Sequence, residues 1–151
     1  MNETLDIKAK AAFPAGQLSN FAAHAFVFDG VDCASMEGFL QSLKIADAAE
    51  QRTVCGLVGE EAQTWGRRYD WSVTGTLWWR GVPMDRLSDE YQVLLDGAYA
   101  ALLAQSKRFR DALRATGQAQ LVHRAGKDDP CTTILTAEEF CSRLERLRAA
   151  G

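Results

Sequence analysis

The sequence has few of the residues that build metal centres or disulfide frameworks. Its four cysteines include no C-x-x-C pair, and its two histidines, His24 and His123, lie far apart. Zinc sites are usually built from closely spaced cysteine and histidine ligands. We therefore expect no metal site and no cofactor. We expect each cysteine to be reduced and to act as a small buried hydrophobic residue; they are Cys33, Cys55, Cys131 and Cys141.

Long apolar runs and an excess of positive charge are also absent. The net charge is −3, so the chain has no broad basic field for tight nonspecific binding of nucleic acid. No apolar run approaches the roughly 20 residues that a membrane-spanning helix needs. No N-terminal segment has the pattern of a signal peptide. We expect a cytoplasmic protein with no membrane partner.

What remains is the composition of an ordinary globular domain. The 151 residues are 47% hydrophobic and 25% charged, which is sufficient to bury a core. No repeat, linker or change of composition marks a boundary, so we expect one domain over residues 1–151. The elements below predict an α+β fold, dominated by helices and with a small antiparallel sheet.

Short strands are expected in three places. Residues 5–9 alternate as an edge strand, and residues 120–123 form a second short apolar run. Residues 26–28 and 31–33 flank Asp29-Gly30, which suits the positive φ angles of a type I′ hairpin turn. Residues 69–83 hold four aromatic side chains without a clean period, so we expect a loop packed on the body.

Helix signals fill most of the remaining chain. Capping residues and apolar spacing predict a first helix from Ser35 to about Asp47 and onward toward Thr53, and a short helix over residues 60–65 with a stop at Gly66. The same signals predict a long helix from Ser88 through Leu103 and another from Ser106 to Thr116-Gly117. A last helix begins at the capping box of residues 136–139. Gly97 inside the longest helix indicates close packing there, because glycine costs about 1 kcal/mol relative to alanine.

Polar side chains in Ser35–Lys44 form a candidate site. Four apolar residues have the spacing of a buried stripe: Met36, Phe39, Leu40 and Leu43. Glu37, Gln41 and Lys44 recur at i, i+4 and i+7, so they share a neighbouring stripe. An acid, an amide and an amine beside a core face either line a pocket or form a solvated face. The pattern alone favours the solvated face.

The same residues resemble the YbiA-like (NADAR) family. The resemblance rests on Leu18-Ser19-Asn20-Phe21, on Phe26 to Gly30 and on Ser35 to Lys44, and it continues through Gly66-Arg67 to Ala115-Thr116-Gly117. The family has a helix beginning Ser-x-Glu-His, with Gln and Lys further along. Ser35, Glu37, Gln41 and Lys44 match this helix, and the resemblance favours the pocket.

Three positions depart from the family pattern. Gly38 stands where the family usually has histidine, and Leu102-Leu103 stand where it usually has a Lys-Phe pair. The loop of residues 124–133 has no Trp-Gly motif after its aspartates. This last departure changes the wall that would face a base.

The resemblance implies an N-glycosidase that hydrolyses the bond between a ribosyl C1 and a nitrogen. The substrate would be a phosphoribosylated or ADP-ribosylated small molecule, such as a riboflavin-pathway intermediate or an ADP-ribosylated base. Nucleic acid would enter only as a modified substrate. Glu37 would stabilise the cationic sugar or activate water. Lys44 would either form an imine as a neutral amine or pair as an ammonium with a phosphate or Glu37.

Further side chains are candidates for substrate binding: Asn20, Phe21, Ser35, Gln41, Arg67, Trp79 and Asp128. Arg67 would hold phosphate, although a solvated arginine fits equally well. A tryptophan of residues 69–83 would stack on a base, although capping of the core is the simpler role. Asp128 would be a second carboxylate.

Two other classes of function stay open. A chain that lacks the family's His, Lys and Trp-Gly residues would be a catalytically inactive module that binds ADP-ribose or NAD. Alternatively, the aromatic segment of residues 69–83 would bind a protein partner.

Overall fold

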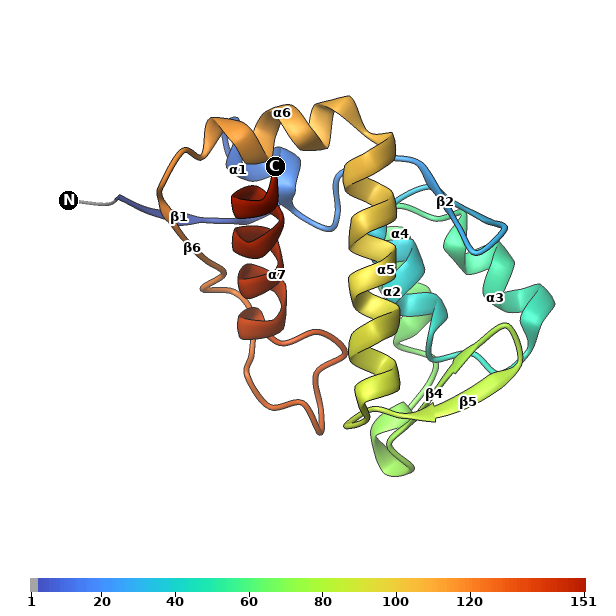
Figure 1. The fold of residues 1–151 in the computed structure, drawn as a ribbon. Coiled ribbons are helices and arrows are strands. Elements are labelled where there is room, and N and C mark those ends of the chain that lie inside the picture. The colour runs from blue at the N-terminus through green and yellow to red at the C-terminus, as the bar shows by residue number, and fades with distance from the viewer. Residues whose placement is uncertain (1–2) are drawn as a thin grey trace.

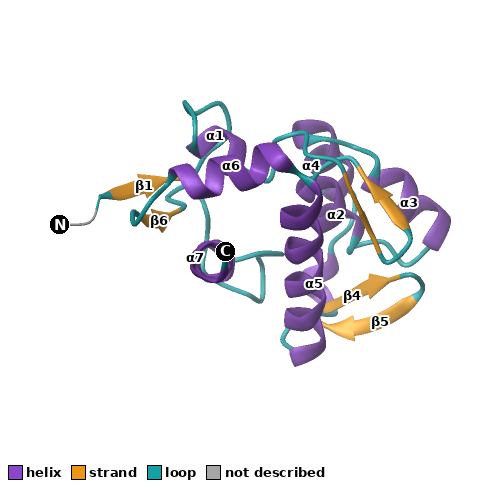
Figure 2. Ribbon diagram, turned by 45° about the horizontal axis from the view of Figure 1, so that its top comes forward, coloured by secondary structure: helices purple, strands orange, loops and turns teal. Residues whose placement is uncertain are grey.

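The long helix α5 (Asp89–Gln105) runs through the middle of the computed structural model, which describes residues 3–151. Figures 1 and 2 show α2, α3, α4 and two hairpins on one side of α5, and α7 with β1 and β6 on the other. Helix α6 crosses one end of α5 and packs beside α1. The fold is α+β and dominated by helices, as expected from the sequence.

The remaining helices are α1 (Ala15–Leu18), α2 (Met36–Ser42), α3 (Ala48–Cys55), α4 (Gly59–Gly66), α6 (Lys107–Ala115) and α7 (Ala137–Ala150), with a 3₁₀ turn at Trp71–Val73. The strands are β1 (Thr4–Asp6), β2 (Phe26–Phe28), β3 (Val31–Cys33), β4 (Thr76–Trp79), β5 (Val82–Asp85) and β6 (Gln120–Val122). They pair as antiparallel β2–β3 and β4–β5 and as parallel β1–β6.

Side-chain caps begin four helices at the residues that the sequence predicted. The hydroxyls of Ser35, Ser88 and Ser106 each accept a hydrogen bond from the backbone three residues later. Thr136 and Glu139 form the predicted capping box. The Asp29-Gly30 hairpin is confirmed, with φ angles of 50° and 75°. Close packing at Gly97 is also confirmed, because a Cβ there would lie 3.0 Å from the Phe28 ring.

The predicted continuation of the first long helix to Asp47 is wrong. Helix α2 ends at Ser42, and Asp47 caps the separate helix α3 by accepting from the Glu50 N–H. Tertiary contacts satisfy the carbonyl groups at the end of α2. The Gln51 amide donates to the Ser42 carbonyl at 3.0 Å, and the Trp78 N–H donates to the Leu43 carbonyl at 2.8 Å. Residues distant in sequence therefore stop this helix, and no local glycine or proline signals it.

The expectation of a loop over residues 69–83 is also wrong, because residues 76–83 belong to the β4–β5 hairpin. Arg80-Gly81 makes the two-residue turn, with φ angles of 51° and 83°. Pro83 argued against a strand, but β5 pairs only with β4 among the described residues, and an edge strand tolerates proline.

The N-terminal strand is shorter than expected, and α1 follows where only a break was expected. The pairing of β1 with β6 is parallel, so the sheets are not all antiparallel.

The core fills the space around α5 and α2 with aliphatic and aromatic side chains. Three cysteines are buried as expected, whereas Cys131 is exposed, which corrects the expectation for that residue. Cys131 lies in the polar loop before α7, and its backbone N–H donates to Asp129 Oδ1 at 2.9 Å. Across residues 3–151, none of the helices combines the length and apolarity that crossing a membrane requires.

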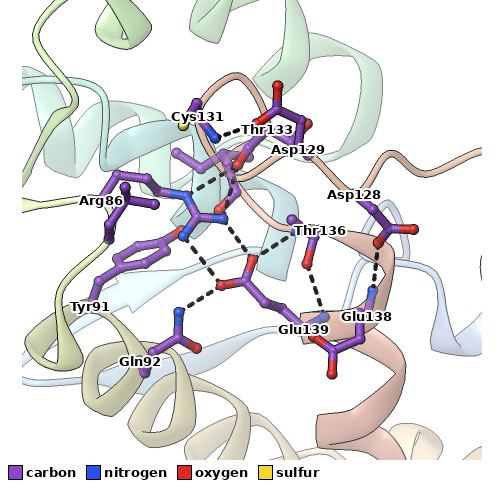
Figure 3. A network of polar contacts seen from close by, with 12 residues as sticks. Arg86, Tyr91, Gln92, Asp128, Asp129, Cys131, Thr133, Thr136, Glu138 and Glu139 are labelled. Atoms are coloured by element: carbon purple, nitrogen blue, oxygen red, sulfur yellow. Dashed lines mark hydrogen bonds and ion pairs between the residues drawn. The ribbon is translucent and has the colours of Figure 1, made fainter.

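One buried arginine joins α5, α7 and the loop before α7 (Figure 3). Arg86 is 1% exposed, and its Nη2 lies 2.6 Å from Glu139 Oε1. Its Nε and Nη2 donate to the Thr133 carbonyl at 3.1 and 3.0 Å. Its guanidinium stacks 4.7 Å from the centre of the Tyr91 ring, and the Tyr91 hydroxyl donates to the Ile134 carbonyl. This network fixes the path of residues 133–135.

Replacing the buried guanidinium should be costly. Arg86→Met leaves the Glu139 carboxylate and the Thr133 carbonyl without their buried donor, and breaking such a pair typically costs about 3–5 kcal/mol. We expect a loss of that size in the free energy of unfolding measured with urea. Lys107→Met is the matched control, because the Lys107–Asp111 pair is exposed. Equal stabilities of the two variants would contradict this assignment.

Candidate active site

A cavity of about 350 Å³ lies where the N-terminal segment, α2, α4 and the loop before α7 come together. Its polar lining residues are Lys8, Ser19, Asn20, Glu37, Gln41, Gln63 and His123. Its apolar lining residues are Ala9, Phe21, Leu40, Ala125, Ile134, Leu135 and Phe140. The volume falls within the range of small-molecule sites, and the convergence of several polar groups beside apolar side chains is typical of them.

Helix α2 brings a carboxylate to this cavity at the cost of burying it. Glu37 is 8% exposed, and its Oε1 accepts a hydrogen bond from Gln41 Nε2 at 2.7 Å. Its backbone N–H donates to the Asn20 carbonyl at 3.0 Å, so the first turn of α2 is tied to the Ser-Asn-Phe segment. Burial raises the pKa of Glu37, while the Gln41 hydrogen bond and the charges of Lys44 and His123 lower it.

Gln41 owes its position to a glycine on α4. A Cβ at Gly66 would lie 1.7 Å from Gln41 Oε1, so the amide occupies the space of a missing side chain. Gly66 is the last residue of α4 and has no positive φ angle. The predicted end of the helix at Gly66 is confirmed, and the close approach to Gln41 is a second role of this glycine. Gln41 Oε1 is itself buried without a hydrogen-bond partner in the described chain.

Lys44 does not line the cavity. It follows the end of α2, in a turn where its N–H donates to the Gln41 carbonyl at 3.2 Å. Burial lowers the pKa of Lys44, the nearby Glu37 carboxylate raises it and Arg67 lowers it. Lys44 and Glu37 therefore interact through charge. Arg67 follows α4 and donates to Gln63, a lining residue, at 3.2 Å.

The other sequence candidates divide into two groups. Asn20 and Phe21 line the cavity, and Asn20 Oδ1 accepts from the Tyr99 hydroxyl at 2.7 Å. Ser35, Trp79 and Asp128 are not among the lining residues.

Each residue of the second group has a local task. The Ser35 hydroxyl donates to the Leu57 carbonyl and caps α2. Trp79 packs in the core, and its Nε1 donates to Asp29 at 2.8 Å. Asp128 accepts from the Glu138 N–H at the start of α7.

Sequence reasoning missed Lys8, Gln63 and His123 as cavity residues. His123 directly follows strand β6, and the end of a strand is a common place for functional side chains, so that signal was available. Nothing in the local sequence marks Lys8 or Gln63. Within residues 3–151, no three histidine, cysteine, aspartate or glutamate side chains are arranged to hold a metal ion.

Comparison with known proteins agrees with this architecture. Residues 12–149 match the family described as Bacteriophage protein GP30.3. A protein of Enterobacteria phage T4, described as an uncharacterized 17.1 kDa protein in the Gp30-rIII intergenic region, is 42% identical over 149 residues, which is 95% of this chain and 96% of that protein. The NMR structure of the E. coli protein YbiA is similar with a TM-score of 0.65 and 19% identity, over 99% of this chain and 86% of that one. The YbiA-like fold expected from the resemblance is confirmed.

The contact between Gly66 and Gln41 can be tested by adding one methyl group. Gly66→Ala should displace the Gln41 amide. The hydrogen bond from Gln41 lowers the pKa of Glu37 in the wild type, so this pKa should rise in the variant. Carbon-13 NMR titration of the Glu37 carboxyl group measures it. Overpacking of this kind typically costs about 1–3 kcal/mol of stability.

Gly56→Ala is the matched control, because its Cβ would lie 3.4 Å from the nearest atom and its φ is −81°. We expect it to leave the Glu37 titration unchanged. An unchanged titration in Gly66→Ala as well would show that Gly66 does not position Gln41.

Proposed function

Because this chain belongs to the bacteriophage protein GP30.3 family and presents a buried carboxylate to a cavity of about 350 Å³, we propose that it is an N-glycosidase. The reaction is hydrolysis of the bond between a ribosyl C1 and a nitrogen. The substrate class is a phosphoribosylated or ADP-ribosylated small molecule or base. No cofactor takes part in the proposed reaction.

The observation that carries this proposal is the state of Glu37. A buried carboxylate with a raised pKa is poorly solvated when ionised. Among the described residues, only the Gln41 amide donates a hydrogen bond to the Glu37 carboxylate. Breaking a ribosyl C–N bond places positive charge on the sugar. Within residues 3–151 Glu37 makes no direct salt bridge, so the sugar cation would be its first ionic partner at contact distance. The attraction is therefore stronger in the transition state than in the ground state, as catalysis requires.

The other lining residues suit the remainder of such a substrate. Gln41 and Asn20 offer amide groups to ribose hydroxyls, and the Phe21 ring offers an apolar face to a base. Lys8 is the lysine that lines the cavity, so we assign it to the substrate phosphate. Arg67 does not line the cavity, but it donates a hydrogen bond to Gln63, which does. Through this contact Arg67 supports the bound phosphate.

Lys44 acts in this proposal as an ammonium. Its charge lowers the pKa of Glu37 and so maintains the ionised carboxylate. An imine with ring-opened ribose would require the amine inside the cavity, and Lys44 is not a lining residue.

Glu37→Gln should abolish turnover while the fold persists. A positioned acid or base typically contributes at least about 100-fold, so release of free base, measured by chromatography on a panel of ribosylated phosphates, should fall by at least that factor.

The same variant should not lose stability. Burial raises the folded-state pKa of Glu37 above its ordinary value of 4.5. Between the pKa of Glu37 in the unfolded state and its higher pKa in the folded state, the folded state binds more protons. The contribution of Glu37 to stability therefore falls as pH rises from the first pKa through the second. The uncharged variant should therefore be at least as stable as the wild type at neutral pH.

Other outcomes of the same assay separate the candidate functions. Full turnover by Glu37→Gln would remove Glu37 from the mechanism. The second candidate function is a module that binds ADP-ribose or NAD without turnover. It is favoured by Leu102 and Leu103, which pack in or against the core at the positions where the YbiA-like family has a Lys-Phe pair. Calorimetric binding of ADP-ribose by a wild type that hydrolyses nothing on the panel would support the module.

Lys44→Met should shift the pH dependence of catalysis. The reaction needs ionised Glu37, so kcat/KM falls as pH decreases through the pKa of Glu37. Removing the Lys44 charge raises that pKa further, because the charge lowers it in the wild type. The acid limb should therefore move to higher pH. Lys107→Met removes an exposed cation of α6 and should leave the limb in place. A limb that stays fixed or moves to lower pH in Lys44→Met would contradict the ammonium role.

A further inference from the structure

The imidazole of His123 is held in one orientation by contacts on three sides. Its Nδ1 lies 2.6 Å from the Ile7 carbonyl oxygen, just beyond the β1–β6 pairing. Its ring meets the Phe140 ring edge-on, with centroids 5.5 Å apart. A Cβ at Gly126 would lie 2.5 Å from His123 Cδ2, so the glycine leaves room for the ring. The parallel pair β1–β6 thus fixes a side chain of the cavity.

The Ile7 contact decides which ring nitrogen is available. A carbonyl oxygen can only accept, so Nδ1 must carry a hydrogen and donate it. In the neutral ring Nε2 then has the free lone pair, and in the charged ring Nε2 carries the second proton. His123 and Glu37 line the same cavity, and their charges interact. The cavity therefore combines a carboxylate with an imidazole whose Nδ1 is engaged by Ile7, which leaves Nε2 for a ligand.

Position 38 provides no imidazole in this chain. A Cβ at Gly38 would lie 2.5 Å from the Leu57 carbonyl oxygen and 2.9 Å from that of Cys55. Helix α2 packs its backbone directly on those carbonyls, so no side chain fits at position 38. His24, the other histidine, is buried away from the cavity against Gln17 and Ser106. His123 is thus the imidazole that lines the cavity.

We infer that His123 Nε2 protonates the leaving nitrogen, and that the substrates are N-ribosides whose base needs a proton in order to depart. This inference rests on the proposed function. As the C1–N bond breaks, its electron pair stays on the departing nitrogen, which takes the proton from Nε2. Water adds its oxygen to C1, and Glu37 takes the released water proton. Exchange with solvent then returns Glu37 and His123 to their starting protonation states.

The inference separates two classes of ribosylated compound. A purine, pyrimidine or amide nitrogen leaves as a poor anion unless an acid protonates it. A ribosyl pyridinium, as in nicotinamide nucleotides, already carries positive charge on nitrogen and leaves as a neutral ring without a proton. His123 therefore contributes to turnover of the first class and contributes little to turnover of the second.

The test is His123→Asn, assayed on ribosyl phosphates with purine, pyrimidine, amide and pyridinium leaving groups. Asparagine keeps an amide N–H near the position of Nδ1 for the Ile7 carbonyl and removes Nε2. We expect kcat to fall at least about 100-fold for leaving groups that need a proton, and less than about tenfold for pyridinium. His123→Gln, which places an amide near Nε2 but cannot release its proton, should show the same selectivity. Thermal melting establishes that each variant is folded.

Lys8→Met is the matched control, since it removes a cation of the same cavity. It should raise KM for all leaving groups alike and leave their relative kcat values unchanged. Equal losses on all leaving groups in both histidine variants, or none, would overturn the role of His123 while the proposed function stands. A wild type that hydrolyses no compound of the panel would contradict the proposed function and the role of His123 together.

Discussion

A carboxylate buried on a short helix constrains much of this structure. All seven residues of α2 are buried, and Glu37 is among them. Its charge is tolerated because Gln41 donates to it, and Gln41 fits only because Gly66 on α4 has no side chain. The backbone of α2 in turn packs against the carbonyl groups at the end of α3. The carboxylate, the amide and the glycine therefore form one unit, and a change in any of them affects the other two.

The opposite wall of the cavity depends on a separate polar network. Arg86 holds the Thr133 carbonyl and Glu139 together, and Tyr91 holds the Ile134 carbonyl, so the loop before α7 has a fixed path. Burial alone would raise the pKa of Glu139, but hydrogen bonds from Arg86 and Gln92 outweigh it and lower that pKa. Residues 134 and 135 of this loop line the cavity beside His123. Helix α5 joins the two sides of the site, because its Tyr91 and Gln92 bind Ile134 and Glu139 while its Tyr99 donates to Asn20.

Local signals in the sequence were sufficient for most elements and for part of the site. Capping hydroxyls, the Asp29-Gly30 turn and the stripe of Glu37 and Gln41 all act over a few residues, and the structure contains them. The end of α2 was missed because Gln51 and Trp78, distant in sequence, satisfy its carbonyl groups. Lys44 consequently leaves the stripe.

Burial of Arg86, the parallel pairing of β1 with β6 and the place of His123 also depend on contacts between distant segments. Such contacts leave no periodic trace in the sequence. The resemblance to the YbiA-like family supplied what periodicity did not, namely that the polar stripe of α2 faces a pocket.

The proposed reaction requires that the cavity hold a cationic sugar against Glu37. Calorimetry with a protonated iminoribitol phosphate and with its uncharged carbocyclic analogue tests this directly, because the two ligands differ mainly in charge. We expect the cation to bind at least about 100-fold more tightly, as a mimic of the transition state should. Equal affinity of the two ligands, or preference for the uncharged one, would contradict it.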